Sequence, residues 1–155
     1  MEALLPLILP NAEVAAGERL LACNRITARY GLTLSPETIS VLLEGRRTAL
    51  ARTGRVEFGG GVLEKLVYAF CDSPYVSQAD YGETLLTLQD LFYHFKNESA
   101  DRLSDDELIE AMARTFDEGA GGSLEYLAGT TLEELCRGLR TPAAEEAVEE
   151  EEEDG

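Results

Sequence analysis

The sequence predicts an all-α protein, a compact bundle of about five to seven helices. Apolar residues recur at helical spacing along most of the chain, and residues typical of helix N-caps and C-caps bracket these segments. Hydrophobic residues make up 45% of the 155 residues, which is enough for one core. We therefore expect a single helical domain over residues 1–140 and a disordered acidic tail over residues 141–155.

The first two helices are expected over residues 11–30 and 35–54. The first ends at Gly31, which suits a left-handed C-cap, and its predicted buried face consists of Leu20, Cys23, Thr27 and Tyr30. The second begins with Ser35, Pro36 and Glu37, an N-cap followed by a first-turn proline and acid, and it ends at Gly54. Its predicted buried residues are Ile39, Leu42, Leu43 and Leu50.

Residues 55–58 alternate polar and apolar, which predicts a short β element or an extended connection with Val56 and Phe58 facing the core. A glycine run at 59–61 follows. The next helix carries a short apolar stripe and ends before Pro74; the stripe consists of Leu63, Leu66, Val67 and Phe70.

The strongest helical period starts at Asp80, with spacings of four, three, four and three between Tyr81, Leu85, Leu88, Phe92 and Phe95. A capping box formed by Ser104 and Glu107 begins a further helix, which we expect Gly119 to close. Its predicted face consists of Leu108, Ile109, Met112 and Phe116. Short helices are predicted at 123–128 and 131–140.

The net charge of −17 is unevenly distributed along the chain. Residues 1–64 hold seven arginines and seven acids, whereas residues 65–155 hold six basic residues and 23 acids. Eight of these acids lie between Glu145 and Asp154, so the body of the domain is acidic as well. Such a field repels nucleic acid and anionic membranes and favours a protein partner with a basic surface.

No apolar run is long enough to span a membrane, and the first residues do not resemble a signal peptide. The three cysteines, Cys23, Cys71 and Cys136, are widely spaced and indicate reduced thiols. We therefore expect a cytoplasmic protein without a membrane partner. No cofactor is expected, and the sequence does not indicate the oligomeric state.

Three groups of residues are candidate sites. Gly59, Gly60 and Gly61 precede a helix carrying Lys65, an arrangement that suits an anion, although a flexible connection explains the glycines as well. Asp90, His94 and Glu98 share one helix face and so form a candidate metal site, although the sequence favours a solvated face on which the two carboxylates stabilise the charged imidazole.

The third group, Cys71, Asp72, Tyr75 and Tyr81, flanks a connection between two buried helices and is a candidate ligand pocket. A helix C-terminus disfavours a thiolate at Cys71, so structural burial is the alternative. No catalytic motif is present, so an enzyme is possible but not favoured.

Residues 31–47, GLTLSPETISVLLEGRR, resemble the turn and second helix of a helix-turn-helix. Local neutrality and the acidic remainder of the chain oppose nucleic-acid binding, because affinity for DNA depends largely on phosphate neutralisation. A nucleic-acid-associated regulator is therefore kept only as an alternative function.

Three longer segments resemble an uncharacterised family of bacterial (Firmicutes) proteins, DUF6323. They are GRVEFGGGVLEKLVYAFCDSPY (residues 54–75), ETLLTLQDLFYHFKNE (83–98) and LSDDELIEAMARTFDEGAGGSLEYLA (103–128). The resemblance spans most of residues 20–140 and implies no activity, cofactor or catalytic residue. The function is thus unknown, and the leading interpretation is a non-enzymatic interaction or regulatory module with an acidic surface. A small-ligand-binding protein or an enzyme with a pocket near Cys71–Tyr81 is the alternative.

Overall fold

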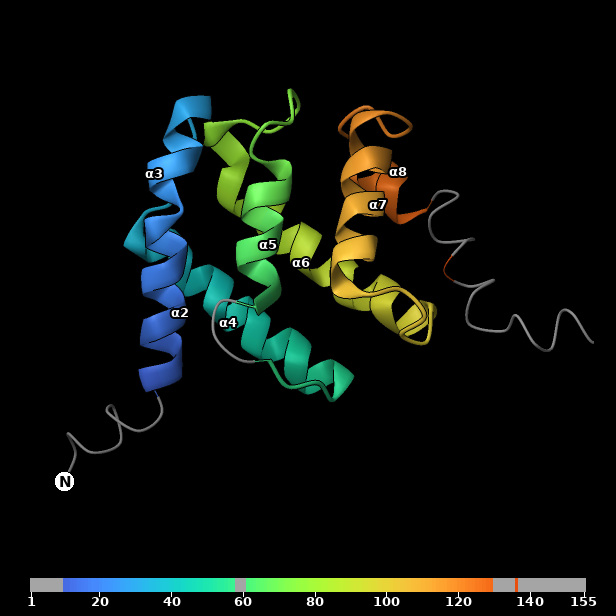
Figure 1. The fold of residues 1–155 in the computed structure, drawn as a ribbon, viewed down its shortest axis with the longest axis horizontal. Helices are drawn as coiled ribbons and strands as arrows, with labels where there is room; N and C mark the ends of the chain where they lie inside the picture. Colours follow the sequence, from blue (N-terminus) through green and yellow to red (C-terminus); the bar gives the residue numbers. More distant parts are fainter. Residues whose placement is uncertain (1–9, 58–60, 130–135, 137–155) are drawn as a thin grey trace, which may run out of the picture.

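The computed structural model describes residues 10–57, 61–129 and 136, and this part of the chain is helical without any strand (Figure 1). The predicted all-α bundle is therefore confirmed. The expected tail at 141–155, Phe58, and the helix expected at 131–140 apart from Cys136 lie outside the described residues.

The first predicted helix is divided into three pieces: α2 (Pro10–Ala22), α3 (Asn24–Thr27) and the 3₁₀ turn η1 (Ala28–Tyr30). Gly31 follows with the expected left-handed backbone, at φ 78°. Leu20, Cys23 and Thr27 are buried as predicted, but Tyr30 is half exposed. The tighter winding of a 3₁₀ turn rotates Tyr30 away from the buried face, so its predicted burial was wrong.

Helix α4 (Pro36–Thr53) begins and ends as the sequence predicts. The Ser35 hydroxyl accepts a hydrogen bond from the backbone N–H of Thr38 at 3.1 Å, and Gly54 adopts a left-handed conformation at φ 69°. A hydroxyl N-cap of this kind stabilises a helix by about 1 kcal/mol. Residues Ile39, Leu42 and Leu43 face the core.

Residues 55–57 form an extended connection rather than a strand. Val56 is 76% exposed, so the prediction that it faces the core was wrong. Glu57 points inward instead, because Arg46 and Tyr93 offer its carboxylate polar partners inside the protein. Helix α5 (Gly61–Phe70) follows, and its predicted apolar stripe is buried.

Helix α6 (Tyr81–Glu98) is the centre of the bundle and contacts α4, α5 and the two helices that follow. It is preceded by the 3₁₀ turn η2 (Gln78–Asp80). All five apolar residues of its predicted stripe are buried, so the strongest period in the sequence marks the most enclosed helix.

Helix α7 (Asp105–Asp117) carries the predicted capping box, with Ser104 and Glu107 each accepting from the other's backbone N–H. Its predicted apolar face is buried. Gly119 does not close the helix as expected. The residues with left-handed backbone are Gly121 and Gly122, which turn the chain into α8 (Leu124–Ala128).

In Figure 1, α2, α5 and α7 stand upright, and α6 crosses behind α5 and α7. Helices α4 and α6 pack closely at two glycines. A Cβ atom on Gly82 would lie 2.7 Å from Thr38 Cγ2, and one on Gly45 would lie 2.4 Å from Leu86 Cδ1. No helix in the described ranges is long and apolar enough to cross a membrane.

Candidate functional site

The N-terminal ends of α4 and α6 border a cleft of about 400 Å³, which we call the α4–α6 groove. Its walls combine apolar and acidic side chains, chiefly Leu34, Thr38, Val41, Asp80, Glu83 and Leu86. Val41 is 52% exposed. The groove therefore offers an apolar contact that the bundle itself does not use.

Two local contacts determine the shape of the groove. The side-chain amide of Gln78 accepts from the backbone N–H of Thr33 at 2.8 Å and donates to the Thr33 carbonyl at 3.1 Å. This pair of bonds joins the loop before α4 to the turn before α6. On the other side, the absence of a side chain at Gly82 lets Thr38 lie against the α6 backbone.

The groove is electronegative. Asp80 and Glu83 are its only charged lining residues, and both are acids. The two helix N-termini nearby contribute about half a positive charge each, which the two carboxylates outweigh. The oxygen Oδ1 of Asp80 accepts from the Ser77 hydroxyl at 2.8 Å, which fixes that carboxylate and leaves Oδ2 available for a donor from a ligand.

The candidate ligand pocket divides into a buried pair and an exposed pair. Cys71 and Tyr81 are buried, whereas Asp72 is exposed and Tyr75 is half exposed. The Tyr75 ring packs edge-on against Phe116 at a centroid distance of 6.2 Å. None of the four lines the α4–α6 groove, and a pocket formed by them stays a prediction.

Burial also affects the ionisation of these groups. It raises the pKa of the Cys71 thiol, and the neighbouring Asp72 raises it further. The pKa of Tyr81 is raised as well, mainly because the ring is enclosed. Both groups are therefore neutral at physiological pH, which does not favour Cys71 as a nucleophile.

The candidate anion site is only partly described, since Gly59 and Gly60 lie outside the described residues. Gly61 begins α5, and a Cβ atom there would lie 2.6 Å from Glu57 Oε1, so the protein already places a carboxylate beside this helix N-terminus. Lys65 instead donates to Asp106 at 2.8 Å. Anion binding stays a prediction, with Lys65 already engaged elsewhere.

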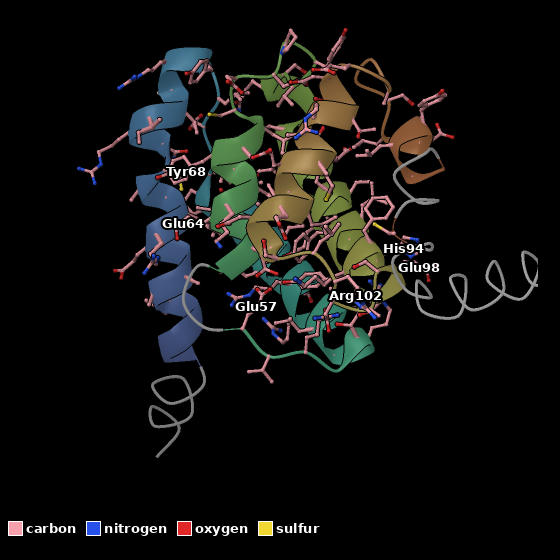
Figure 2. All side chains as sticks on the ribbon, turned by 45° about the vertical axis from the view of Figure 1, so that its right-hand side comes forward. Glu57, Glu64, Tyr68, His94, Glu98 and Arg102 are labelled. Atoms are coloured by element: carbon pink, nitrogen blue, oxygen red, sulfur yellow. The ribbon has the colours of Figure 1, made fainter. Side chains whose placement is uncertain are left out.

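The candidate metal residues lie along one side of α6, where Figure 2 shows His94 and Glu98 as neighbours. Asp90 is 3.9 Å from Arg52, an ion pair between exposed side chains. Across the described part of the chain, no group of three or more His, Cys, Asp or Glu side chains is arranged to hold a metal ion. The arrangement adds no support to metal binding, which stays a prediction.

A buried polar cluster was not predicted. Arg46 Nε lies 3.3 Å from Glu57 Oε1, and the Tyr93 hydroxyl donates to Glu57 Oε2. The Nε–Oε1 contact is an ion pair whose geometry is not that of a hydrogen bond. In the sequence, Arg46 and Glu57 are simply charged residues near predicted buried segments. Nothing in their spacing indicates that they contact each other.

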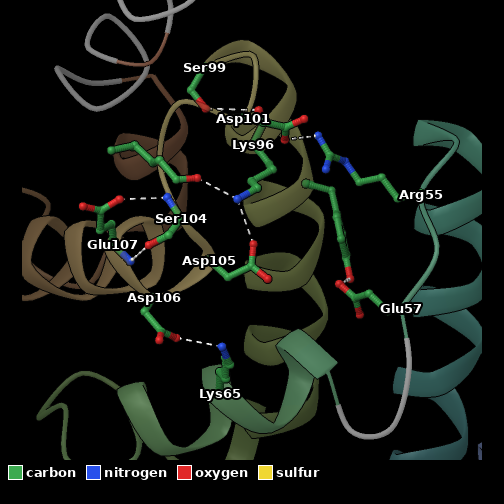
Figure 3. A network of polar contacts seen from close by, with 12 residues as sticks. Arg55, Glu57, Lys65, Lys96, Ser99, Asp101, Ser104, Asp105, Asp106 and Glu107 are labelled. Atoms are coloured by element: carbon green, nitrogen blue, oxygen red, sulfur yellow. Dashed lines mark hydrogen bonds and ion pairs between the residues drawn. The ribbon is translucent and has the colours of Figure 1, made fainter.

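A second polar network closes the lower end of the bundle, shown in Figure 3. Lys96 Nζ donates to the Leu103 carbonyl at 2.6 Å and pairs with Asp105 at 2.8 Å. Arg55 pairs with Asp101 at 2.7 Å. These contacts connect α6, α7 and the 55–57 connection. Their role in holding the bundle together explains these charged side chains without a ligand.

The segment resembling a helix-turn-helix, residues 31–47, forms the turn at Gly31, the loop that follows and the first two thirds of α4. The exposed face of α4 carries Glu37 and Glu44 as well as Arg47. Acids on this face oppose phosphate contact. Nucleic-acid binding therefore stays an alternative without added support.

The fold and the groove define a small all-helical domain with an acidic cleft. The chain matches the family model described as "Family of unknown function (DUF6323)" over residues 19–145 and belongs to that family. No curated protein and no solved structure matches the chain. The molecular function is accordingly unknown.

Proposed function

We propose that this protein is an interaction module that binds a basic segment of a partner protein in the α4–α6 groove, within the cytoplasm. The observation that carries the proposal is the combination in one cleft of exposed Val41 with two carboxylates and no basic residue among its lining. The reduced state of the buried thiols Cys23 and Cys71 suits that compartment.

A lysine or arginine side chain fits both features of the groove. Its aliphatic part would lie along Val41 and Leu86, and its charged end would lie between Asp80 and Glu83. A salt bridge at an exposed cleft contributes only about 0–1 kcal/mol, so burial of the apolar stem must supply most of the affinity. The charges would chiefly select the partner and speed its approach.

The overall charge works in the same direction. With a net charge of −17, the protein attracts basic surfaces over roughly one Debye length, about 8 Å at physiological salt. An acidic partner would be repelled from the groove on approach. The basic class of partner therefore follows from both the local and the overall field.

The test is a titration of the full-length, isotope-labelled protein with a synthetic amphipathic peptide in which lysines alternate with leucines. We expect amide shifts concentrated at Val41, Gly82 and Leu86. The double variant Asp80→Asn/Glu83→Gln should weaken binding several-fold. The matched control, Glu118→Gln/Glu125→Gln, removes the same charge from exposed positions just after α7 and on α8 and should bind as the parent does.

A second peptide, with glutamate in place of each lysine, should cause no shifts in the groove. If the lysine peptide shifts residues elsewhere, or if both double variants weaken binding equally, the groove is not the binding site. Binding that is indifferent to salt between about 50 and 500 mM would refute the electrostatic part of the proposal.

A further inference from the structure

A second cleft, of about 510 Å³, has three arginines and one acid among its lining residues, in contrast to the acidic α4–α6 groove. It is formed by the end of α2, by α3 with η1, and by the side of α5 that faces α2, where Figure 2 shows Glu64 and Tyr68. We call it the arginine cleft, and its main lining residues are Arg19, Arg25, Ile26, Arg29, Glu64 and Tyr68.

Three arginines face one acid in this cleft, on a protein that is otherwise strongly acidic. Glu64 is already engaged, because Arg19 Nε donates to its Oε1 at 2.9 Å. Within the described chain, neither Arg25 nor Arg29 forms an ion pair. Two guanidinium groups are thus available to carboxylates, each with a planar set of donors that suits them.

The cleft also offers apolar contact. Ile26 is 43% exposed and Tyr68 is 40% exposed. The pKa of Tyr68 is raised to about 12, mainly by its hydrogen bond with the Cys23 thiol, and Arg25, which lines the same cleft, lowers it. A ligand that combines carboxylates with small apolar groups matches this lining.

We propose that the acidic C-terminal segment of this same chain, residues 141–155, binds the arginine cleft. The segment holds eight acids and no basic residue, and Ala143, Ala144, Ala147 and Val148 supply small apolar groups. An acidic peptide from another protein would be repelled by the net charge of −17, whereas an attached segment needs no encounter and acts at an effective concentration near the millimolar range.

The length of the chain permits this contact. Cys136 is buried and marks the last described position, and Glu149 lies 13 positions after it. An extended chain of that length spans roughly 43 Å. A domain of this size has a radius of gyration of about 14 Å, which for a sphere means a diameter of roughly 36 Å. A path over the surface to the opposite face covers roughly 57 Å, half the circumference of such a sphere, and the extended chain from Cys136 to Asp154 covers roughly 59 Å. The last acids of the segment therefore reach the opposite face of the domain.

The experiment uses the full-length chain with Gly155→Cys, labelled with a nitroxide at that single exposed thiol; the three native cysteines are buried. Paramagnetic broadening of backbone amides is then measured by NMR. We expect broadening at Ile26 and Tyr68, on the cleft, and none at Val41, which lines the α4–α6 groove. Broadening should disappear at about 500 mM salt.

The variant Arg25→Gln/Arg29→Gln should lose the broadening at the cleft. The matched control, Arg52→Gln/Arg114→Gln, removes two exposed arginines elsewhere and should keep it. Full chains in which Glu149 to Glu153 become Gln and Asp154 becomes Asn should behave like the Arg25/Arg29 variant.

A mixed sample distinguishes binding within one chain from binding between two chains. It contains nitroxide-labelled chains without isotope enrichment and isotope-enriched chains without a nitroxide. Broadening only within one chain supports the proposal. Broadening between chains would overturn it in favour of the acidic segment of a second copy. No selective broadening, or equal loss in both arginine variants, would overturn it altogether. These outcomes do not involve the α4–α6 groove, so they are independent of the proposed function.

Discussion

The hydroxyl of Tyr93, on the central helix α6, donates a hydrogen bond to the carboxylate of Glu57 in the connection between α4 and α5. Arg46 lies on the other side of the same carboxylate. The two contacts together join α4, the 55–57 connection and α6, and they hold the carboxyl group of Glu57 where only 15% of its side chain is exposed. Burial and the bond to Glu57 both raise the pKa of Tyr93, so its proton stays in place.

We expect Glu57→Gln to destabilise the protein by about 3 kcal/mol, because it removes the charge from one side of the enclosed Arg46–Glu57 ion pair. Tyr93→Phe should cost roughly 1–2 kcal/mol, the loss of one hydrogen bond to a charged group. Urea unfolding measures both. Asp90→Asn, which removes the exposed pair with Arg52, is the control and should change stability by less than about 1 kcal/mol. Equal effects for Glu57→Gln and Asp90→Asn would contradict this assignment.

Two helical glycines should respond to substitution in opposite ways, because only Gly82 lies at the close approach of α4 and α6. Gly17→Ala in α2 should stabilise by about 0.5–1 kcal/mol, because the new Cβ meets only ordinary contacts at 3.6 and 3.7 Å. Gly82→Ala should destabilise by about 1 kcal/mol, because its Cβ would overlap Thr38 Cγ2. Thermal unfolding of the two variants provides the measurement, and stabilisation by both would show that the crossing is loosely packed.

The turn after α6 contains two consecutive residues with left-handed backbone, Ala100 at φ 52° and Asp101 at φ 62°. Alanine has no side-chain group that favours this conformation, so Ala100→Gly should stabilise by roughly 0.5–1 kcal/mol. Ala51→Gly, in exposed helical backbone of α4, is the matched control and should destabilise by about 1 kcal/mol. Loss of stability in both variants would exclude strain at Ala100.

The capping box of α7 predicts a pH dependence. The pKa of Glu107 is lowered, first by the backbone N–H of Ser104 and then by its side chain. A lowered pKa means that the ionised form stabilises the fold, so this contribution is complete above about pH 4.5 and is lost as pH falls through the folded-state pKa. Thermal unfolding of Glu107→Ala should therefore differ from the parent at pH 7 and converge with it near pH 3. The exposed control Glu118→Ala should show no such convergence.

The helices were predictable because their signals are local. The stripe of α6 and the capping box of α7 each lie within one segment, and burial of residues such as Leu88 and Met112 follows from spacing alone. The orientation of the 55–57 connection was not predictable, because a two-residue period does not say which face is buried. Glu57, and not Val56, points inward because Arg46 and Tyr93, from two helices, provide polar partners there.

The groove depends on the relation between helices, which explains why sequence reasoning missed it. It exists because Gly82 admits Thr38 and because Gln78 reaches Thr33, a residue 45 positions away. The predicted pocket assumed that the connection between α5 and α6 opens a cleft. Cys71 and Tyr81 are buried at that connection, and the pocket itself stays a prediction.

The two hydrogen bonds between the Gln78 side chain and the Thr33 backbone have a consequence for selectivity. The oxygen and the nitrogen of the Gln78 side-chain amide bind the N–H and the carbonyl of Thr33, respectively. The mouth of the groove therefore widens only if both hydrogen bonds break. An occupant meets a width fixed in advance, which spares the ordering cost of an adaptable site. If the groove binds a basic side chain as proposed, we therefore expect it to discriminate by the thickness of that side chain as well as by its charge.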